Sequence, residues 1–94
     1  MQHGRLRAMA YEEAQDGRCP RCGRKFAPYS RQRETHTRDA RTFDHVVPLA
    51  RRGVDEGNLL LLHKRCNEEK ADRPATGCEL LTLMVVNLRL GFAR

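Results

Sequence analysis

Apolar residues gather in three stretches of the chain, and two of them have the length of strands. The stretch TFDHVV at 42–47 is rich in β-branched and aromatic residues, which predicts a strand that ends at Pro48. The run NLLLL at 58–62 is too short for an independent helix and predicts a buried strand. Residues 64–72, KRCNEEKAD, predict a helix that stops before Pro74. The centre of the chain should therefore fold as strand, long loop, strand and helix.

The third apolar stretch, at 76–90, predicts a second helix. Its large apolar residues cover most of a helix circumference, so the helix must be buried somewhere. They are Leu80, Leu81, Leu83, Met84, Val85, Val86, Leu88 and Leu90. Packing on the chain's own core is the preferred interpretation, and a homodimer contact is the alternative. Residues 1–16 have few helix breakers and fit either a short helix or a loose basic arm, whereas the polar residues 28–41 predict an irregular loop.

A chain of 94 residues forms one domain at most, and we place its core at about 17–73. So short a domain commonly needs a metal, disulfides or a partner chain for stability. The N-terminus has no apolar signal core, and no stretch reaches the roughly 18 apolar residues of a membrane span. We therefore expect a cytoplasmic protein that makes no membrane contact. In that reducing compartment, the four cysteines indicate metal binding before disulfides.

The charge balance favours a polyanionic partner. Lys and Arg total 18 against 12 Asp and Glu, which gives a net charge of +6, and most of the basic residues are arginines. Arginine matches the geometry of phosphate in a way that lysine does not. Nucleic acid is the commonest such partner, although a basic surface without any partner fits the composition equally well.

Two pairs of residues have the spacing of metal ligands. Cys19 and Cys22 are separated by a proline and an arginine, and Gly23 follows, which is typical of a tight zinc knuckle. His63 and Cys66 have the same two-residue gap. The segment between the pairs is longer than the roughly 15 to 20 residues of a simple zinc ribbon. We expect one tetrahedral structural zinc to be held by both pairs and to clamp the base of the strand–loop–strand unit.

The fourth zinc ligand is the least certain member of this set. His36 or Cys78 could replace His63, although Cys78 opens the apolar tail, where a free cysteine behaves as a small hydrophobe. The alternative for Cys19 and Cys22 is a redox pair or unrelated thiols.

From Thr42 to Lys70 the sequence TFDHVVPLARRGVDEGNLLLLHKRCNEEK resembles the HNH endonucleases, also called ββα-metal or His-Me finger nucleases. The matching elements, in order, are Asp44-His45, Pro48, Asn58-Leu59, Cys66-Asn67 and Lys70. Cys19 and Cys22 match the zinc-containing branch, so the resemblance extends over residues 19 to about 70. The chain departs from the usual pattern at His63, where the branch commonly has cysteine, and at Asn67, where the third motif residue is more often histidine.

The resemblance implies an α+β fold, a small ββα-metal domain clamped by zinc with flanking helices, and hydrolysis of DNA. It assigns His45 as general base, which suits an imidazole whose pKa lies near neutrality. It assigns Asp44 and Asn67 as ligands of a catalytic Mg²⁺ or Mn²⁺, because hard cations prefer oxygen donors. Asn58 is implied to support the loop that orients His45. Each of these residues alone is most simply structural, and only their order and spacing together favour catalysis.

Three further points stay open at the level of sequence. Arg51, Arg52 and Lys70 are candidate phosphate contacts, although charged faces are usually only solvated. DNA is favoured over RNA by the resemblance alone. A zinc-stabilised nucleic-acid-binding module without catalysis, or an idle HNH scaffold in a phage packaging or bacterial restriction complex, remains an alternative to the enzyme.

Overall fold

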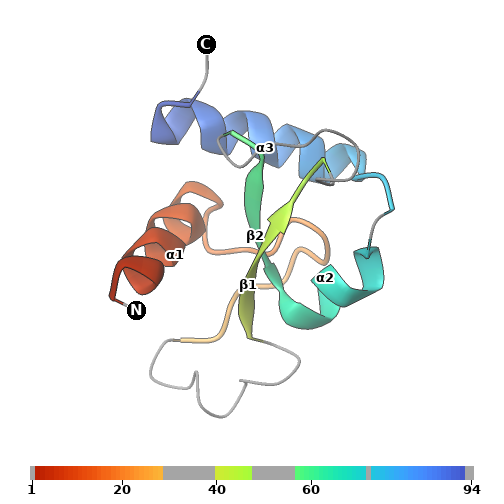
Figure 1. Ribbon diagram of the computed structural model, residues 1–94, viewed down its shortest axis with the longest axis horizontal. Coiled ribbons are helices and arrows are strands. Elements are labelled where there is room, and N and C mark those ends of the chain that lie inside the picture. Colours follow the sequence, from red (N-terminus) through yellow and green to blue (C-terminus); the bar gives the residue numbers. More distant parts are fainter. Residues whose placement is uncertain (1, 29–39, 48–56, 72, 93–94) are drawn as a thin grey trace.

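The computed structural model describes residues 2–28, 40–47, 57–71 and 73–92 (Figure 1). Three helices and a two-stranded sheet follow one another along the chain. In order they are α1 (Gln2–Ala14), β1 (Arg41–His45), β2 (Leu59–His63), α2 (Lys64–Lys70) and α3 (Gly77–Leu90). The predicted α+β fold is confirmed, and within the N-terminal segment predicted as a helix or a loose arm, Gln2–Ala14 form a helix.

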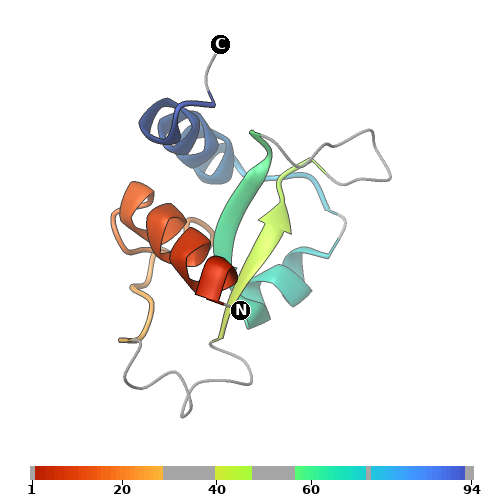
Figure 2. The same ribbon diagram turned by 60° about the vertical axis from the view of Figure 1, so that its left-hand side comes forward.

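The two strands pair antiparallel, with Asp44 opposite Leu60 and Arg41 opposite His63. All five residues of β2 are buried, whereas β1 is buried fully only at Asp44. This difference follows from the sequences, because β2 has four consecutive leucines before His63, whereas Phe43 is the one large apolar residue of β1. Helices α1 and α2 lie on opposite sides of the sheet, and α3 crosses one end of it (Figures 1 and 2).

Helix α1 covers the outer edge of β2 as well as one face of the sheet. The rings of Tyr11 and Phe43 meet edge to face, with centroids 5.1 Å apart. Just after α1, the side-chain amide of Gln15 donates to the Leu61 carbonyl at 2.9 Å and accepts from the Leu61 N–H at 2.7 Å. Gln15 therefore replaces a neighbouring strand at this edge, whose backbone groups would otherwise be buried without partners.

Helix α3 begins and ends with standard caps. The Thr76 hydroxyl accepts a hydrogen bond from the Glu79 N–H at 3.2 Å, and Gly91 closes the helix in the left-handed conformation with φ of 82°. Within the helix only Glu79 and Val86 are fully buried. Asn87 donates to the Gly57 carbonyl at 3.0 Å, which joins the helix to the start of β2.

The preferred interpretation of the tail, that it packs on the core of its own chain, is wrong for most of its apolar residues. Leu83 and Leu90 do pack partly against the core beside Val86. Five other large apolar residues of α3 stay exposed, with exposed fractions between 39% and 69%. They are Leu80, Leu81, Met84, Val85 and Leu88. The reason is geometric, since a helix that crosses the end of a two-stranded sheet can bury only one of its faces.

Candidate zinc site and active site

The first two zinc-type ligands lie in a tight turn after α1. The Cys19 N–H donates to the Arg24 carbonyl at 2.9 Å, and the Gly23 N–H donates back to the Cys19 carbonyl at 2.8 Å. Gly23 has φ of 75°, a conformation that a residue with a Cβ rarely adopts. These bonds fold the chain back on itself, so that Cys19 is buried while Cys22 lies at the surface.

The second pair comes from the junction between β2 and α2, and it meets the first. The ligand atoms of Cys19, Cys22, His63 and Cys66 all lie within 4.8 Å of one another. The Cys22 Sγ is 3.4 Å from the His63 Nδ1. Thiolates bind zinc at about 2.3 Å and imidazole nitrogens at about 2.0 Å, so four donors this close fit a tetrahedral ion. The set could hold a zinc ion, as the spacing predicts.

The geometry also bears on the alternatives for the fourth ligand. His63 occupies the fourth position of the cluster, and its ring stacks at a tilt against Phe26, with centroids 4.8 Å apart. Cys78 lies exposed at the start of α3 and is not a member. His36 lies outside the residues that the structure describes.

The thiols of the cluster lie close enough to shift one another's pKa. Burial, together with the negative charge of Cys19, raises the pKa of Cys66 to about 12. Burial also works against ionisation of Cys22, but hydrogen bonds from the Arg24 backbone and the neighbouring thiols outweigh it and lower its pKa. Three thiolates packed together need a compensating charge, which a divalent metal supplies.

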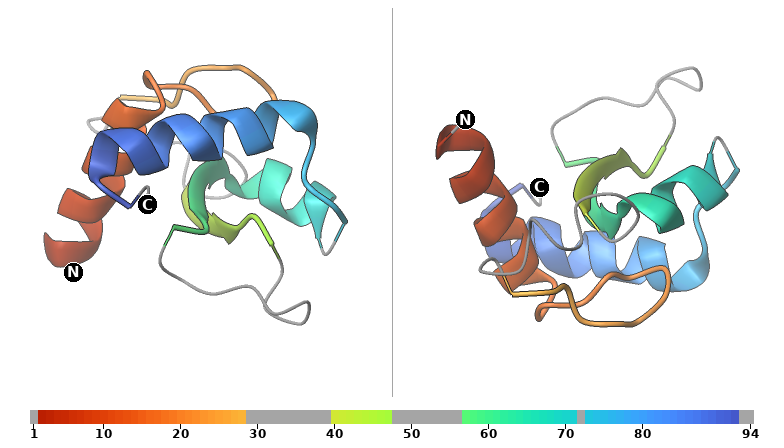
Figure 3. Two further views of the ribbon diagram at one scale, coloured as in Figure 1. Left: turned by 90° about the horizontal axis from the view of Figure 1, so that it is seen from above. Right: turned by 90° about the horizontal axis from the view of Figure 1, so that it is seen from below.

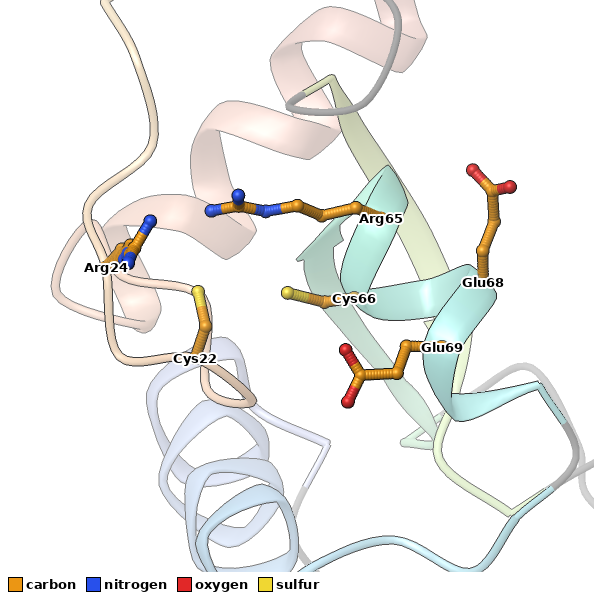
Figure 4. Close-up of a pocket in the computed structure, with 6 residues that line it drawn as sticks. All are labelled: Cys22, Arg24, Arg65, Cys66, Glu68 and Glu69. Atoms are coloured by element: carbon orange, nitrogen blue, oxygen red, sulfur yellow. The ribbon is translucent and has the colours of Figure 1, made fainter.

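The outer side of the cluster opens into a pocket of about 690 Å³ (Figure 4). Its lining residues are Cys22, Arg24, Arg65, Cys66, Glu68 and Glu69. The Cys66 side chain points toward Cys22, and the Cys22 sulfur points to the side on which Arg24 and Arg65 lie (Figure 4). The charge of Arg65 helps to lower the pKa of Cys22. A zinc ion held by three thiolates would carry a net negative charge, which these arginines would offset.

One turn further along α2 from Cys66 lies a buried ion pair. The Lys70 Nζ is 3.0 Å from the Asp44 Oδ2, and the two side chains are 1% and 7% exposed. Lys70 also donates to the carbonyls of His45, at 3.3 Å, and of Val46, at 3.5 Å. The expectation that Lys70 contacts phosphate is therefore not supported, because its ammonium is buried against the end of β1 and does not face solvent.

Asp44 lies in an environment that penalises its charge. Burial raises the pKa of its carboxyl and the charge of Glu79 adds to that effect, while Lys70 acts in the opposite direction. Despite the contact with Lys70, Oδ2 accepts no well-aligned hydrogen bond from the described part of the chain. A buried carboxylate oxygen in that state can accept a further cation or donor.

Asn67 follows the zinc-type ligand Cys66 directly and lies against β1. Its Nδ2 donates to the Thr42 hydroxyl at 3.1 Å and to the Phe43 carbonyl at 3.3 Å. Thr42 and Asp44 share one face of β1, because strand residues two apart point the same way. Asn67 thus lies against the strand that carries Asp44, and its side-chain hydrogen bonds to this strand come from its nitrogen Nδ2.

Asn58 pins the backbone that leaves β1 after His45. Its Oδ1 accepts from the Val47 N–H at 2.8 Å, and its Nδ2 donates to the Val47 carbonyl at 2.9 Å. The Asn58 carbonyl also accepts from the Val46 N–H at 2.8 Å. His45 itself lies half-buried at the last position of β1. The loop at 48–56, including Arg51 and Arg52, lies outside the described residues.

A protein-family model described as HNH endonuclease matches residues 19–73. The match includes all four zinc-type ligands, both strands and α2, and it extends over more than half of the chain. The chain belongs to the HNH endonuclease family. A search of curated proteins finds no match to it. Membership of the HNH family indicates a nuclease-type function, and the resemblance noted in the sequence is confirmed.

Within this HNH domain, sequence reasoning missed a second buried ion pair. The Glu79 side chain is 0% exposed, and its Oε1 accepts from the Arg21 guanidinium at 2.9 Å and from the Thr76 hydroxyl at 3.2 Å. Thr76 and Glu79 have the spacing of a capping box, which marks the start of a helix. That signal predicts the cap, but it does not predict that Glu79 is buried or that it pairs with Arg21.

Among the described residues, no helix is both long enough and apolar enough to pass through a membrane.

Proposed function

We propose that this HNH protein is an endonuclease that uses a divalent metal to hydrolyse phosphodiester bonds in DNA. The observation that supports this most directly is that Asp44 shares one face of β1 with Thr42, to which Asn67 bonds. A carboxylate and an amide carbonyl are oxygen donors of the kind that Mg²⁺ and Mn²⁺ prefer. Asn67 is also the direct neighbour of Cys66, so closing the zinc site helps to place it.

The proposed roles follow from the chemistry of the side chains. His45 accepts a proton from the attacking water, a task that typically accelerates a reaction by ~10²- to 10⁴-fold. Asp44 and Asn67 hold the catalytic ion, which would stabilise charge on the phosphate. Asn58 fixes the backbone beyond His45 through two hydrogen bonds to Val47 and so restricts where the imidazole can lie.

The substrate class is proposed from charge and from family membership. A net charge of +6 attracts polyanions, and HNH nucleases act on nucleic acids. Arg51 and Arg52, in the loop between the strands, are the proposed phosphate contacts. DNA is the proposed substrate, and RNA is treated as an alternative outcome of the test below.

The test is cleavage of supercoiled plasmid by the zinc-loaded protein, with Mg²⁺, Mn²⁺ or chelator, compared with His45→Ala and with a control variant. Arg73→Ala is the control, because Arg73 is exposed and lies outside the proposed site. We expect metal-dependent cutting by wild type and Arg73→Ala, and a loss of at least 100-fold in His45→Ala. Zinc content and circular dichroism should be the same in all three proteins.

Two results would reject the proposal. One is intact plasmid with every metal, and the other is equal cutting by His45→Ala. A parallel reaction on single-stranded and double-stranded RNA decides the substrate class, since cutting of RNA alone would reject DNA.

One observation favours the rival function, a zinc-stabilised nucleic-acid-binding module without catalysis. The Lys70 ammonium already lies 3.0 Å from Asp44 and competes with a metal for that carboxylate. Plasmid binding that is tight and salt-dependent, without cutting in any metal, would support that module.

A further inference from the structure

The outer face of α3 is the largest set of exposed apolar side chains among the described residues. We define it by Leu80, Leu81, Met84, Val85 and Leu88, of which Leu81, Met84 and Leu88 are each more than 60% exposed. Seen from above, α3 lies across the molecule with no other described helix or strand over it (Figure 3). Monomeric proteins rarely expose so many neighbouring apolar side chains without a partner.

The spacing along the outer face of α3 is that of a helix-pairing seam. Leu81, Met84 and Leu88 are separated by three and then four residues, which is the alternation of the two inner positions of a coiled coil. Leu80 and Val85 flank this line and are apolar as well. A partner of irregular shape would not require this spacing. The occupant should therefore itself be a helix with an apolar stripe.

The charges of α3 select the kind of occupant. None of the outer-face residues is charged. Glu79 is turned into the domain toward Arg21, and Arg89 bonds to the Ala14 carbonyl and to Asp16, each at 2.9 Å. The face therefore offers nothing to a nucleic acid. It is also a surface through which two chains of net charge +6 can approach without bringing like charges together.

We propose that the outer face of α3 is a homodimer seam, in which the α3 of a second copy packs against it around a two-fold axis. A two-fold interface needs a patch that is complementary to itself, and an uncharged, evenly apolar helix face meets that condition. The five side chains expose on the order of 500 Å² per copy, so that pairing removes about 1,000 Å² in total, the lower limit for a specific interface. The dimer should accordingly be weak, with a Kd in the micromolar range.

The dimer has a consequence for cleavage that rests on the proposed nuclease function. One active site cuts one strand at a time, whereas a dimer carries two active sites. Wild type at concentrations above the dimer Kd should convert supercoiled plasmid to linear plasmid directly, and a monomeric variant should accumulate the nicked form.

The test measures the mass of zinc-loaded protein by sedimentation equilibrium, without nucleic acid, from about 1 to 100 µM. Leu81→Lys places a charge in the seam, and Leu6→Lys makes the same change on α1, where the side chain is 64% exposed against 65% for Leu81. We expect wild type and Leu6→Lys to dimerise and Leu81→Lys to remain monomeric over this range. Circular dichroism should show equal helix content in all three proteins.

Three outcomes overturn the inference. A wild-type monomer at 100 µM removes the seam, and a dimer that survives in Leu81→Lys lies on a different surface. Binding of monomeric wild type to vesicles of zwitterionic lipid would assign the face to a membrane surface instead. A dimer that fails to cut DNA contradicts only the nuclease proposal, and a monomer that cuts contradicts only the seam.

Discussion

The ion pair between Arg21 and Glu79 joins the turn that carries Cys19 and Cys22 to α3, and its loss should destabilise the whole domain. Arg21 lies between the zinc-type ligands Cys19 and Cys22, and its guanidinium is 2.9 Å from the Glu79 Oε1. The Glu79 side chain is 0% exposed and that of Arg21 is 16% exposed. Arg21→Met keeps an apolar stem of similar length, but it leaves a buried carboxylate whose remaining hydrogen-bond donor among the described residues is the Thr76 hydroxyl.

The size of the effect follows from this burial. Removing one partner of a buried pair typically costs 3–5 kcal/mol, because the other charge stays in the interior uncompensated. Water can reach the partly exposed Arg21, which favours the lower end, about 3 kcal/mol. Small domains have only about 5 kcal/mol in all, and their urea m-values are about 1 kcal/mol/M, so the unfolding midpoint should fall by about 2–3 M.

A double-mutant cycle in urea measures this coupling. Glu79→Gln removes the orphaned charge, so the double variant Arg21→Met/Glu79→Gln should recover at least about 1 kcal/mol relative to Arg21→Met. Glu69→Gln is the matched control, because Glu69 lies 3.7 Å from the same guanidinium but is 71% exposed, and it should change stability by less than about 0.5 kcal/mol. A single variant as stable as wild type, or a double variant no more stable than Arg21→Met, would show that burial does not govern this pair.

Three further predictions concern the zinc ligands and the proposed active site. Strong chelators should unfold the protein cooperatively, because the free energy of zinc binding contributes to folding. Metal analysis of purified variants should show less zinc in His63→Ala and unchanged zinc in Cys78→Ser. A loss of zinc in Cys78→Ser would contradict the proposed ligand set. Because burial raises the pKa of Asp44, the folded protein keeps this proton to a higher pH than the unfolded chain. Wild type should therefore gain stability relative to Asp44→Asn as pH falls from 7 toward 5, and an unchanged difference between the two urea midpoints would argue against a raised pKa. Asn58→Ala should cost about 1–2 kcal/mol and reduce cleavage without loss of zinc, since it removes both hydrogen bonds to Val47, and full activity in this variant would separate the loop anchor from catalysis.

The sequence by itself determined the features that depend on spacing and local pattern. The two-residue gaps of Cys19–Cys22 and His63–Cys66 predicted the ligand cluster, because a gap of that length lets both side chains of a pair face one ion. The apolar runs predicted both strands to within a residue or two, and the order of motif residues identified the family before the fold was described. Each pair and each apolar run is local in the sequence, and the order of the motif residues is read along the chain, so none of these signals needs the tertiary contacts.

Only the tertiary structure decided which charged and apolar side chains are buried. Lysine is usually exposed, yet Lys70 is buried against Asp44 because its side of α2 faces the end of β1. Glu79 can be buried because Arg21 pairs with it, from the turn between Cys19 and Cys22 that is distant in the sequence. The tail helix is apolar nearly all round, and nothing in its pattern says which face the domain covers. A two-stranded sheet covers only one face of this helix, through Val86 and its neighbours. A core this small has too little apolar surface to cover the other side, so the outer face of α3 stays exposed.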